Sequence, residues 1–277
     1  MVYIPVDIDE AVRRECRRRK YSERTIKTYL YCINRFLKFA NKPINRISKR
    51  DVRLFLESLS ENGMAGNTMN VNHMAIRFLF EDVLDKRIWI DIKYSKVPGK
   101  LPVVLSKEEV RKLFSVIGNP KHKLMMQLMY SAGLRVSELI NLNINDIELD
   151  KNYGWVRGGK GGKDRLFIVA DYLKDGLRKF VESRNNNEWL FISQRNKKYD
   201  MRSLQQIIKR AGKGAKLEKN ISCHTLRHSF ATHLLEDGCS VSEVQSLLGH
   251  KSPETTFVYL HTASPNMIKI KSPLDNL

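Results

Sequence analysis

The sequence predicts a mainly α-helical chain with one small β-sheet or hairpin, divided into an all-helical N-terminal domain and a mixed α+β C-terminal domain. Three observations lead to this fold class. Over most of its 277 residues, apolar side chains recur at helical spacing between serine and glycine end signals. Two β-rich runs, 147–158 and 164–170, surround the glycine-rich GGKGG at 158–162. The stretch 93–102 places prolines and a glycine among lysines without periodicity, which is typical of a linker.

The N-terminal domain is expected over residues 1–92, with three amphipathic helices. A serine cap opens the first helix, 22–42, in which apolar residues follow the helical period. A serine and an aspartate three residues later open the second, 48–63, and a glycine ends it. The third follows an asparagine over 67–83. A basic face precedes these helices and consists of Arg13, Arg14, Arg17, Arg18, Arg19 and Lys20.

The C-terminal domain is expected over residues 103–277. Ser106 and Glu109 form a capping box for a first helix, and the apolar segment 121–132 predicts a core helix that a glycine terminates. The two β-rich runs come next, read as a hairpin or small sheet around GGKGG. Helices are expected again from Leu173 to the end. The small sheet would therefore lie within a largely helical domain.

The charge balance points to a polyanionic partner. The chain has 49 Lys+Arg against 30 Asp+Glu, a net charge of +19, split as +9 over residues 1–100 and +10 over 101–277. A basic excess on both halves favours two domains that share one polyanionic partner, a nucleic acid, although a merely cationic surface is the alternative. The side chains expected to contact DNA are Arg17, Arg18, Lys20, Lys96, Lys100, Lys163, Lys197, Lys198, Arg202 and Lys209.

The cysteines and the N-terminus indicate a cytoplasmic protein. The four cysteines, which lack CxxC spacing, argue against a zinc site and a disulfide framework and read as buried thiols in a reducing compartment. They are Cys16, Cys32, Cys223 and Cys239. No basic segment followed by an apolar core begins the sequence, and no run of about 18 apolar residues occurs, so no membrane segment is expected.

Four motifs place basic or hydroxyl groups at unusual positions: GLRVSEL (133–139), GGKGGKDR (158–165), HTLRHSFATHLL (224–235) and LGHKSPETTFVYLH (248–261). In the first, Arg135 opens a helix, where the helix dipole does not favour a cation. It could bind an anion there, or pair on the surface with Glu138 at i+3. In the second, Lys160 lies in a turn with two glycines on each side, where a hairpin tip could reach a groove. Lys163 remains its competitor.

The other two motifs supply two histidines, an arginine and a tyrosine. His224 and Arg227 are three residues apart on a helix and should face the same way, with His228 pointing elsewhere. A helix that ends at a glycine cap places His250 just past its end. Tyr259 falls about two turns into the next helix, and by itself it would more often be a core residue.

Together these groups are what metal-free phosphoryl transfer needs. Two guanidiniums can hold the non-bridging oxygens and offset the charge of the transition state. A tyrosine can attack phosphorus covalently, with a histidine as base and a lysine to protonate the leaving oxygen. Without a carboxylate cluster, an HExxH motif or a cysteine pair, neither a metal nor another cofactor is expected.

These motifs, in this order, resemble the tyrosine recombinase (phage integrase) family, and among its branches the Xer recombinases. The similarity spans roughly residues 103–262, and the N-terminal half resembles the family's core-binding domain in pattern. The resemblance implies six catalytic residues: Arg135, Lys160, His224, Arg227, His250 and Tyr259. Tyr259 would form a 3′-phosphotyrosyl link and free a 5′ hydroxyl. Four protomers on two duplexes would then exchange strands through a Holliday junction.

The resemblance also implies a role for the end of the chain. Family members commonly dock this tail, here 264–277, onto a neighbouring protomer, and Ile268, Ile270 and Leu274 would be its apolar anchors. The preferred biological role is chromosome-dimer resolution at an inverted-repeat, dif-like site. The alternatives are an integrase of a mobile element, a type IB topoisomerase and a non-catalytic DNA-binding protein, for which 195–198 and the lysines around 209–219 would suffice.

Overall fold

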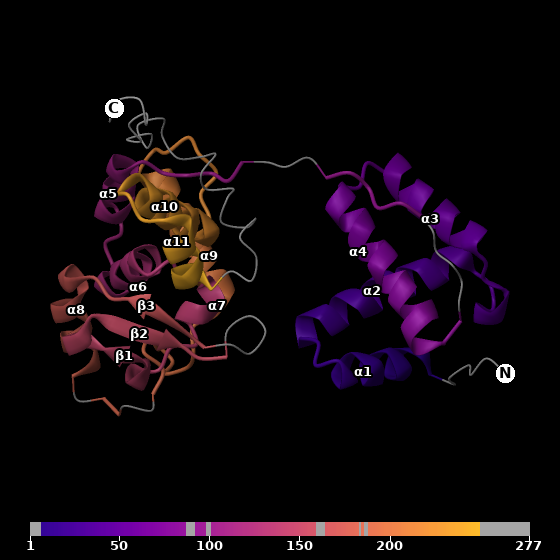
Figure 1. Ribbon diagram of the computed structural model, residues 1–277, viewed down its shortest axis with the longest axis horizontal. Helices are drawn as coiled ribbons and strands as arrows, with labels where there is room; N and C mark the ends of the chain where they lie inside the picture. Colours follow the sequence, from indigo (N-terminus) through magenta and orange to yellow (C-terminus); the bar gives the residue numbers. More distant parts are fainter. Residues whose placement is uncertain are drawn as a thin grey trace, which may run out of the picture. The chain divides into compact units, whose positions relative to one another are not determined.

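The computed structural model describes residues 7–86, 92–97, 101–158, 164–182, 184–185 and 188–249. The chain divides into two compact units, Met1–Gly99 and Lys100–Leu277 (Figure 1). Each unit has its own cluster of buried apolar side chains. In the described part of the chain, no helix is both long and apolar enough to cross a membrane.

The first unit is a helical bundle. Its elements are α1 (Ile8–Arg18), α2 (Glu23–Ala40), the 3₁₀ turn η1 (Ile44–Arg46), α3 (Lys49–Glu61), α4 (Gly66–Arg77) and the π-helical turn η2 (Phe78–Val83). The three predicted helices correspond to α2, α3 and α4 with its π-helical continuation. Phe36 of α2 stacks edge-to-face on Phe55 of α3 and on Phe80 at the centre of the unit.

Helix α1 was not predicted as a helix, because only its basic face was recognised in the sequence. Its N-cap is Asp7, whose side chain accepts a hydrogen bond from the Glu10 backbone N–H. Val12 and Cys16, four residues apart, are fully buried. The arginines occupy the other positions, so this short helix buries a narrow apolar stripe and exposes its charges.

The second unit consists of helices and a small sheet, with α6 contributing to its core. Its helices are α5 (Lys107–Ser115), α6 (Pro120–Ser131), α7 (Val136–Leu139), α8 (Asp171–Val181), α9 (Met201–Gly214), α10 (Cys223–Glu236) and α11 (Val241–Leu248), with 3₁₀ turns η3 (Ile144–Asp146) and η4 (Leu149–Lys151). The predicted capping box of Ser106 and Glu109 opens α5. Four side chains of α6 are buried in the core: Met125, Met126, Leu128 and Met129.

The sheet confirms the predicted strand pair and adds a short third strand. Strands β1 (Ile147–Glu148), β2 (Tyr153–Val156) and β3 (Arg165–Ile168) run antiparallel in the order β1-β2-β3. Val156 pairs with Arg165, so the connection that contains GGKGG leaves and re-enters the sheet at neighbouring positions. Between α8 and α9, where only helices were expected, Trp189 forms an isolated β-bridge with Asn143, which precedes η3, and Ile192 forms one with Lys198.

Candidate active site

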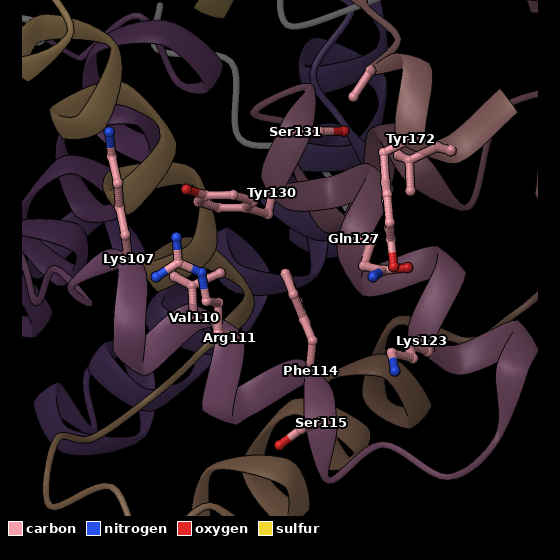
Figure 2. A pocket seen from close by; sticks show the side chains of 12 residues that line it. Lys107, Val110, Arg111, Phe114, Ser115, Lys123, Gln127, Tyr130, Ser131 and Tyr172 are labelled. Carbon is pink, nitrogen blue, oxygen red and sulfur yellow. The ribbon is translucent and has the colours of Figure 1, made fainter.

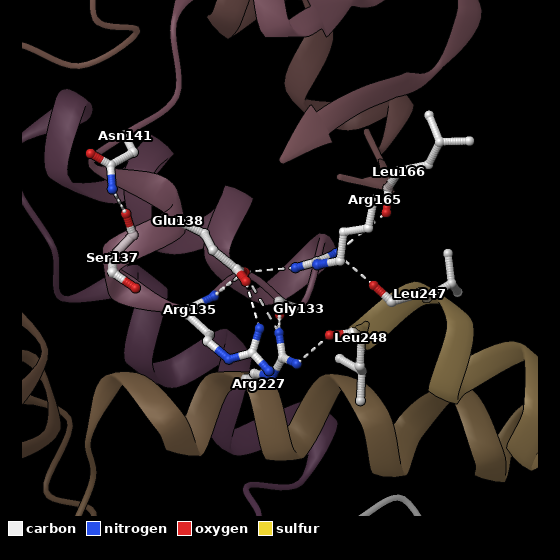
Figure 3. A network of polar contacts seen from close by, with 10 residues as sticks. All are labelled: Gly133, Arg135, Ser137, Glu138, Asn141, Arg165, Leu166, Arg227, Leu247 and Leu248. Carbon is white, nitrogen blue, oxygen red and sulfur yellow. Dashed lines mark hydrogen bonds and ion pairs between the residues drawn. The ribbon is translucent and has the colours of Figure 1, made fainter. Parts of the chain in front are cut away.

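A single carboxylate, Glu138 of α7, lies among three guanidiniums (Figure 3). Arg135 Nη1 is 2.6 Å from Glu138 Oε1, and Arg165 Nη2 is 2.7 Å from Oε2. Arg227 Nη1 is 3.7 Å from the same Oε2. Burial opposes ionisation of Glu138, but the positive charges, Arg165 foremost, lower the pKa of its carboxyl below the usual range. The cluster therefore keeps an excess of positive charge.

Arg135 is placed by the turn that ends α6. Gly133 adopts φ +57°, and a Cβ added there would lie 2.5 Å from a ring carbon of Phe230. Only glycine fits this turn, which leads through the buried Leu134 to Arg135 at the N-cap of α7. The Arg135 backbone N–H donates to Glu138 Oε2 at 2.8 Å. The Arg135 side chain is 22% exposed, so its guanidinium remains accessible to a ligand.

Arg227 of α10 is buried and connects the ends of two helices, α6 and α11. Its Nη1 donates to the Gly133 carbonyl at 2.5 Å, and its Nη2 donates to the Leu248 carbonyl at 2.6 Å. These acceptors are the residue after the C-cap of α6 and the last residue of α11. The guanidinium of Arg227 therefore binds both the turn before Arg135 and the end of α11. The sequence-predicted pair of arginines thus converges on Glu138 in the structure.

His224 is exposed and lies one turn before Arg227, near the start of α10. Partial desolvation lowers the pKa of its imidazole, and the charges of Arg227 and Arg135 lower it further. Near neutral pH this imidazole is uncharged and can accept a proton.

His228 shares a helix face with His224, and the prediction that it points elsewhere was wrong. The rings of His224 and His228 lie 6.2 Å apart, because residues four apart share a helix face. Burial lowers the pKa of His228 to about 4, and the neighbouring His224 and Arg227 add to that shift.

Arg165 and Glu138 are the residues of this cluster that the sequence analysis did not place in the site. The sequence does contain a signal that Arg165 is buried. Arg165 and Phe167 are two residues apart in β3 and so share one face of the strand, and Phe167 is buried. An arginine on the buried face of a strand needs a partner inside the protein. Glu138 was considered only as a surface partner of Arg135, but its side chain is only 6% exposed.

Several predicted residues lie outside the described residues. They are Lys100, Lys160, Lys163, His250, Tyr259 and the tail 264–277. The base of the loop that carries Lys160 and Lys163 is described. There, Asp164 accepts hydrogen bonds from the Gly158 backbone N–H at 2.8 Å and from Arg157 at 3.2 Å.

The other candidate DNA contacts occupy exposed positions on both units. Exposed side chains belong to Arg17, Arg18, Lys20, Lys96, Lys197, Lys198, Arg202 and Lys209. Two of them have partners in the structure. Arg18 pairs with Glu15 at 2.6 Å, and Lys198 contacts Asn141 and lies 4.6 Å above the Trp189 ring.

A cavity of about 550 Å³ lies between α5, α6 and the start of α8 (Figure 2). Its walls include Val110, Phe114 and Tyr130, with Lys107 and Arg111 at one side. The Tyr130 hydroxyl is hydrogen-bonded to His233 Nδ1 at 2.8 Å. No side chain of the arginine cluster lines this cavity, so it is a separate feature of the second unit.

Comparisons with known proteins identify both units. Residues 103–265 match the Phage integrase family, and residues 9–90 match the N-terminal SAM-like domain of phage integrases. Tyrosine recombinase XerA of Thermococcus kodakarensis is 39% identical over 246 residues, covering 86% of this chain and 84% of that protein. XerA of Pyrococcus horikoshii is 36% identical over 251 residues, covering 89% of this chain and 86% of that protein.

Solved structures share the fold. A crystal structure of XerA recombinase matches with a TM-score of 0.55 at 29% identity, covering 94% of this chain and 96% of that one. XerH bound to a palindromic difH substrate in a post-cleavage complex matches with a TM-score of 0.72 at 22% identity, covering 94% and 82%. Fold and relatives together define an enzyme that cleaves and rejoins DNA in site-specific recombination. The chain belongs to the phage integrase family, the tyrosine recombinases.

Proposed function

We propose that this enzyme is an Xer-type recombinase that resolves chromosome dimers in the cytoplasm at an inverted-repeat, dif-like site. Four protomers would act on two duplexes and exchange strands through a Holliday junction. Two findings favour this role: the similarity to two XerA proteins over most of the chain, and a basic excess on both halves. The C-terminal tail 264–277 would bind a neighbouring protomer.

The observation that carries the proposed chemistry is the convergence of Arg135 and Arg227 on Glu138, next to the uncharged His224. The guanidiniums would hold the non-bridging oxygens of the scissile phosphate, where charge grows in the transition state. Each group would act at low energetic cost because it is already oriented by protein contacts.

The covalent step follows from the same groups. The Tyr259 Oη would attack phosphorus and form a 3′-phosphotyrosyl bond, while the bond from phosphorus to the 5′ oxygen breaks. His224 would accept the tyrosine proton, and His250 would assist at the phosphate. Lys160, or Lys163 in its place, would protonate the leaving 5′ oxygen.

Recognition of DNA would use exposed basic side chains on both units. Arg202, Lys209 and Lys213 of α9 are seven and four residues apart, so they lie along one stripe of the helix. Lysines of the linker and Arg17, Arg18 and Lys20 would add contacts to phosphates. Such contacts position the enzyme but do not identify the DNA sequence that it reads.

The nucleophile can be tested with a nicked suicide substrate that traps the covalent intermediate. Tyr259→Phe should bind its DNA site as the wild type does but form no covalent adduct. Tyr172→Phe is the matched control, since Tyr172 is 80% exposed and lies outside the arginine cluster. Adduct formation by Tyr259→Phe at the wild-type level would show that another residue is the nucleophile.

A mobile-element integrase is the second candidate. A putative integrase/recombinase of Sinorhizobium fredii is 33% identical over 264 residues, covering 94% of this chain and 85% of that protein. The two roles can be separated with supercoiled plasmids that carry candidate genomic sites, followed by sequencing of the recombined junctions. Junctions at a chromosomal inverted repeat would support the Xer role, and junctions at the ends of a mobile element would support the integrase.

A further inference from the structure

Arg165 connects three elements of the second unit through its two terminal nitrogens (Figure 3). Nη2 lies 2.7 Å from Glu138 Oε2 of α7, and Nη1 donates to the Leu247 carbonyl of α11 at 2.5 Å. Nη1 also lies 3.3 Å from the carbonyl of Leu166, the next residue in β3. The side chain is only 9% exposed. Both terminal nitrogens of Arg165 therefore hold protein acceptors, and through them the side chain links β3 to α7 and α11.

The position of Arg165 in the chain gives these contacts a consequence for the reaction. It is the first residue of β3 and pairs with Val156, so it is the point at which the loop 157–164 returns to the sheet. Asp164 closes the base of that loop through Gly158. The start of β3 is therefore the described anchor of the segment that carries Lys160 and Lys163.

The same side chain also reaches the end of α11. The final carbonyls of a helix have no partner within the helix. Here the Leu247 carbonyl accepts a hydrogen bond from Arg165, and the Leu248 carbonyl accepts one from Arg227. A Cβ added to Gly249 would lie 2.6 Å from Arg165 Cδ. Arg165 thus links the start of β3 both to the guanidinium cluster and to the end of α11.

We infer that Arg165 is a positioning residue that sets the loop lysine, the proposed proton donor, relative to the phosphate-binding arginines. This inference rests on the proposed function. Arg165 Nε is buried without a hydrogen-bond partner among the described residues, so the benefit of this side chain comes from its terminal nitrogens. Lysine would keep the charge beside Glu138 but cannot bridge Glu138 and Leu247 with a planar fork.

The test compares two leaving groups in Arg165→Lys. With an ordinary phosphodiester, the 5′ oxygen must take a proton from the lysine as its bond to phosphorus breaks. With a 5′-bridging phosphorothiolate, the sulfur leaves as a thiolate and needs no proton. We expect Arg165→Lys to form the covalent adduct about 10- to 100-fold more slowly than the wild type on the ordinary substrate, since a small misplacement has such an effect. On the phosphorothiolate its rate should return to near the wild-type rate.

The ratio of the two rates within each enzyme preparation is insensitive to a partly unfolded fraction. Arg165→Gln, which retains a donor without the charge, is the second variant and should show the same recovery. Arg178→Lys is the matched control, because Arg178 is 52% exposed on α8 and pairs with Asp150. Unchanged rates in Arg165→Lys, or equal slowing on both substrates, would overturn the inference. A wild type that forms no adduct with either substrate would instead contradict the proposed function.

Discussion

Glu138 brings together guanidiniums from three different elements. Arg135 comes from the start of α7, Arg165 from β3 and Arg227 from α10. One carboxylate cannot neutralise three guanidiniums, so a net positive charge remains at the cluster, and this suits a phosphate. The ionised carboxylate also reduces the repulsion among the three cations, which allows them to share a small buried volume.

Replacing Glu138 should therefore destabilise the fold. In Glu138→Gln the three guanidiniums lose their shared counter-charge, and the free energy of unfolding should fall by about 3 kcal/mol. Denaturant unfolding at pH 7 measures this change. Glu148→Gln is the control, because Glu148 lies 3.9 Å from Lys151 on the surface, and this exposed pair should contribute little. Equal stability of the two variants would contradict the proposed role of Glu138 in the cluster.

His228 should make stability depend on pH. The pKa of its imidazole is lowered from 6.5 to about 4 in the folded protein. As the pH falls between these values, the unfolded chain takes up a proton that the folded chain does not, so stability decreases. Between pH 7 and pH 5 this histidine should cost about 2 kcal/mol. His228→Gln should remove that part of the pH dependence in denaturant titrations, and a variant with the wild-type pH profile would refute the assignment.

Helix α11 determines where the chain lies as it approaches His250. Ser240 and Glu243 form the capping box at its start, and Gly249 adopts φ +62° at its end. The left-handed conformation is what a glycine cap allows, and the last two carbonyls of the helix accept from Arg165 and Arg227. Both ends of this short helix are thus defined by specific contacts.

Gly249→Ala should disturb this end of α11. A left-handed alanine costs about 1–2 kcal/mol by itself, and the added Cβ would also lie 2.6 Å from Arg165 Cδ. Gly63→Ala is the control, because Gly63 has φ +67° and nothing within 4 Å of an added Cβ. We expect Gly249→Ala to lose more stability than Gly63→Ala in thermal unfolding, and to slow covalent adduct formation while Gly63→Ala does not. Similar losses in both would argue against the close contact with Arg165.

At the scale of the whole molecule, the charge and the chemistry point in the same direction. The chain carries a net charge of +19, and both halves have a basic excess. Basic surface provides sequence-independent affinity for a duplex, and the guanidinium cluster supplies the positive charge that a metal ion provides in other phosphoryl-transfer enzymes. DNA cleavage should therefore not need a divalent cation.

We expect the enzyme to form the covalent adduct with DNA equally well with and without excess EDTA. The measurement is the yield of adduct on the nicked substrate with and without the chelator, after dialysis of the enzyme against EDTA. A metal-dependent nuclease treated in parallel is the positive control for chelation. Loss of adduct under chelation, restored by added Mg²⁺, would favour a metal-assisted mechanism.

Much of the fold could be predicted because its signals are local. The caps at Ser22, Ser106 and Ser240 and the glycine end at Gly249 each depend on residues within one turn, so the sequence predicts them directly. The π-helical turn after α4 and the two isolated β-bridges were not predicted. Of the two bridges, Asn143–Trp189 joins residues that are distant in the chain, so the local sequence carries no signal for it.

The sequence by itself determined the fold class, the two-part organisation of the helical pattern and the family, because amphipathic periods, caps and long motifs are written in neighbouring residues. Only the tertiary structure decided how the arginines are arranged. Arg165 meets Glu138 and Leu247 across 27 and 82 residues of chain, and Arg227 meets Gly133 across 94. Local sequence carries no signal for such partners, because burial and charge pairing are settled only when distant elements pack together.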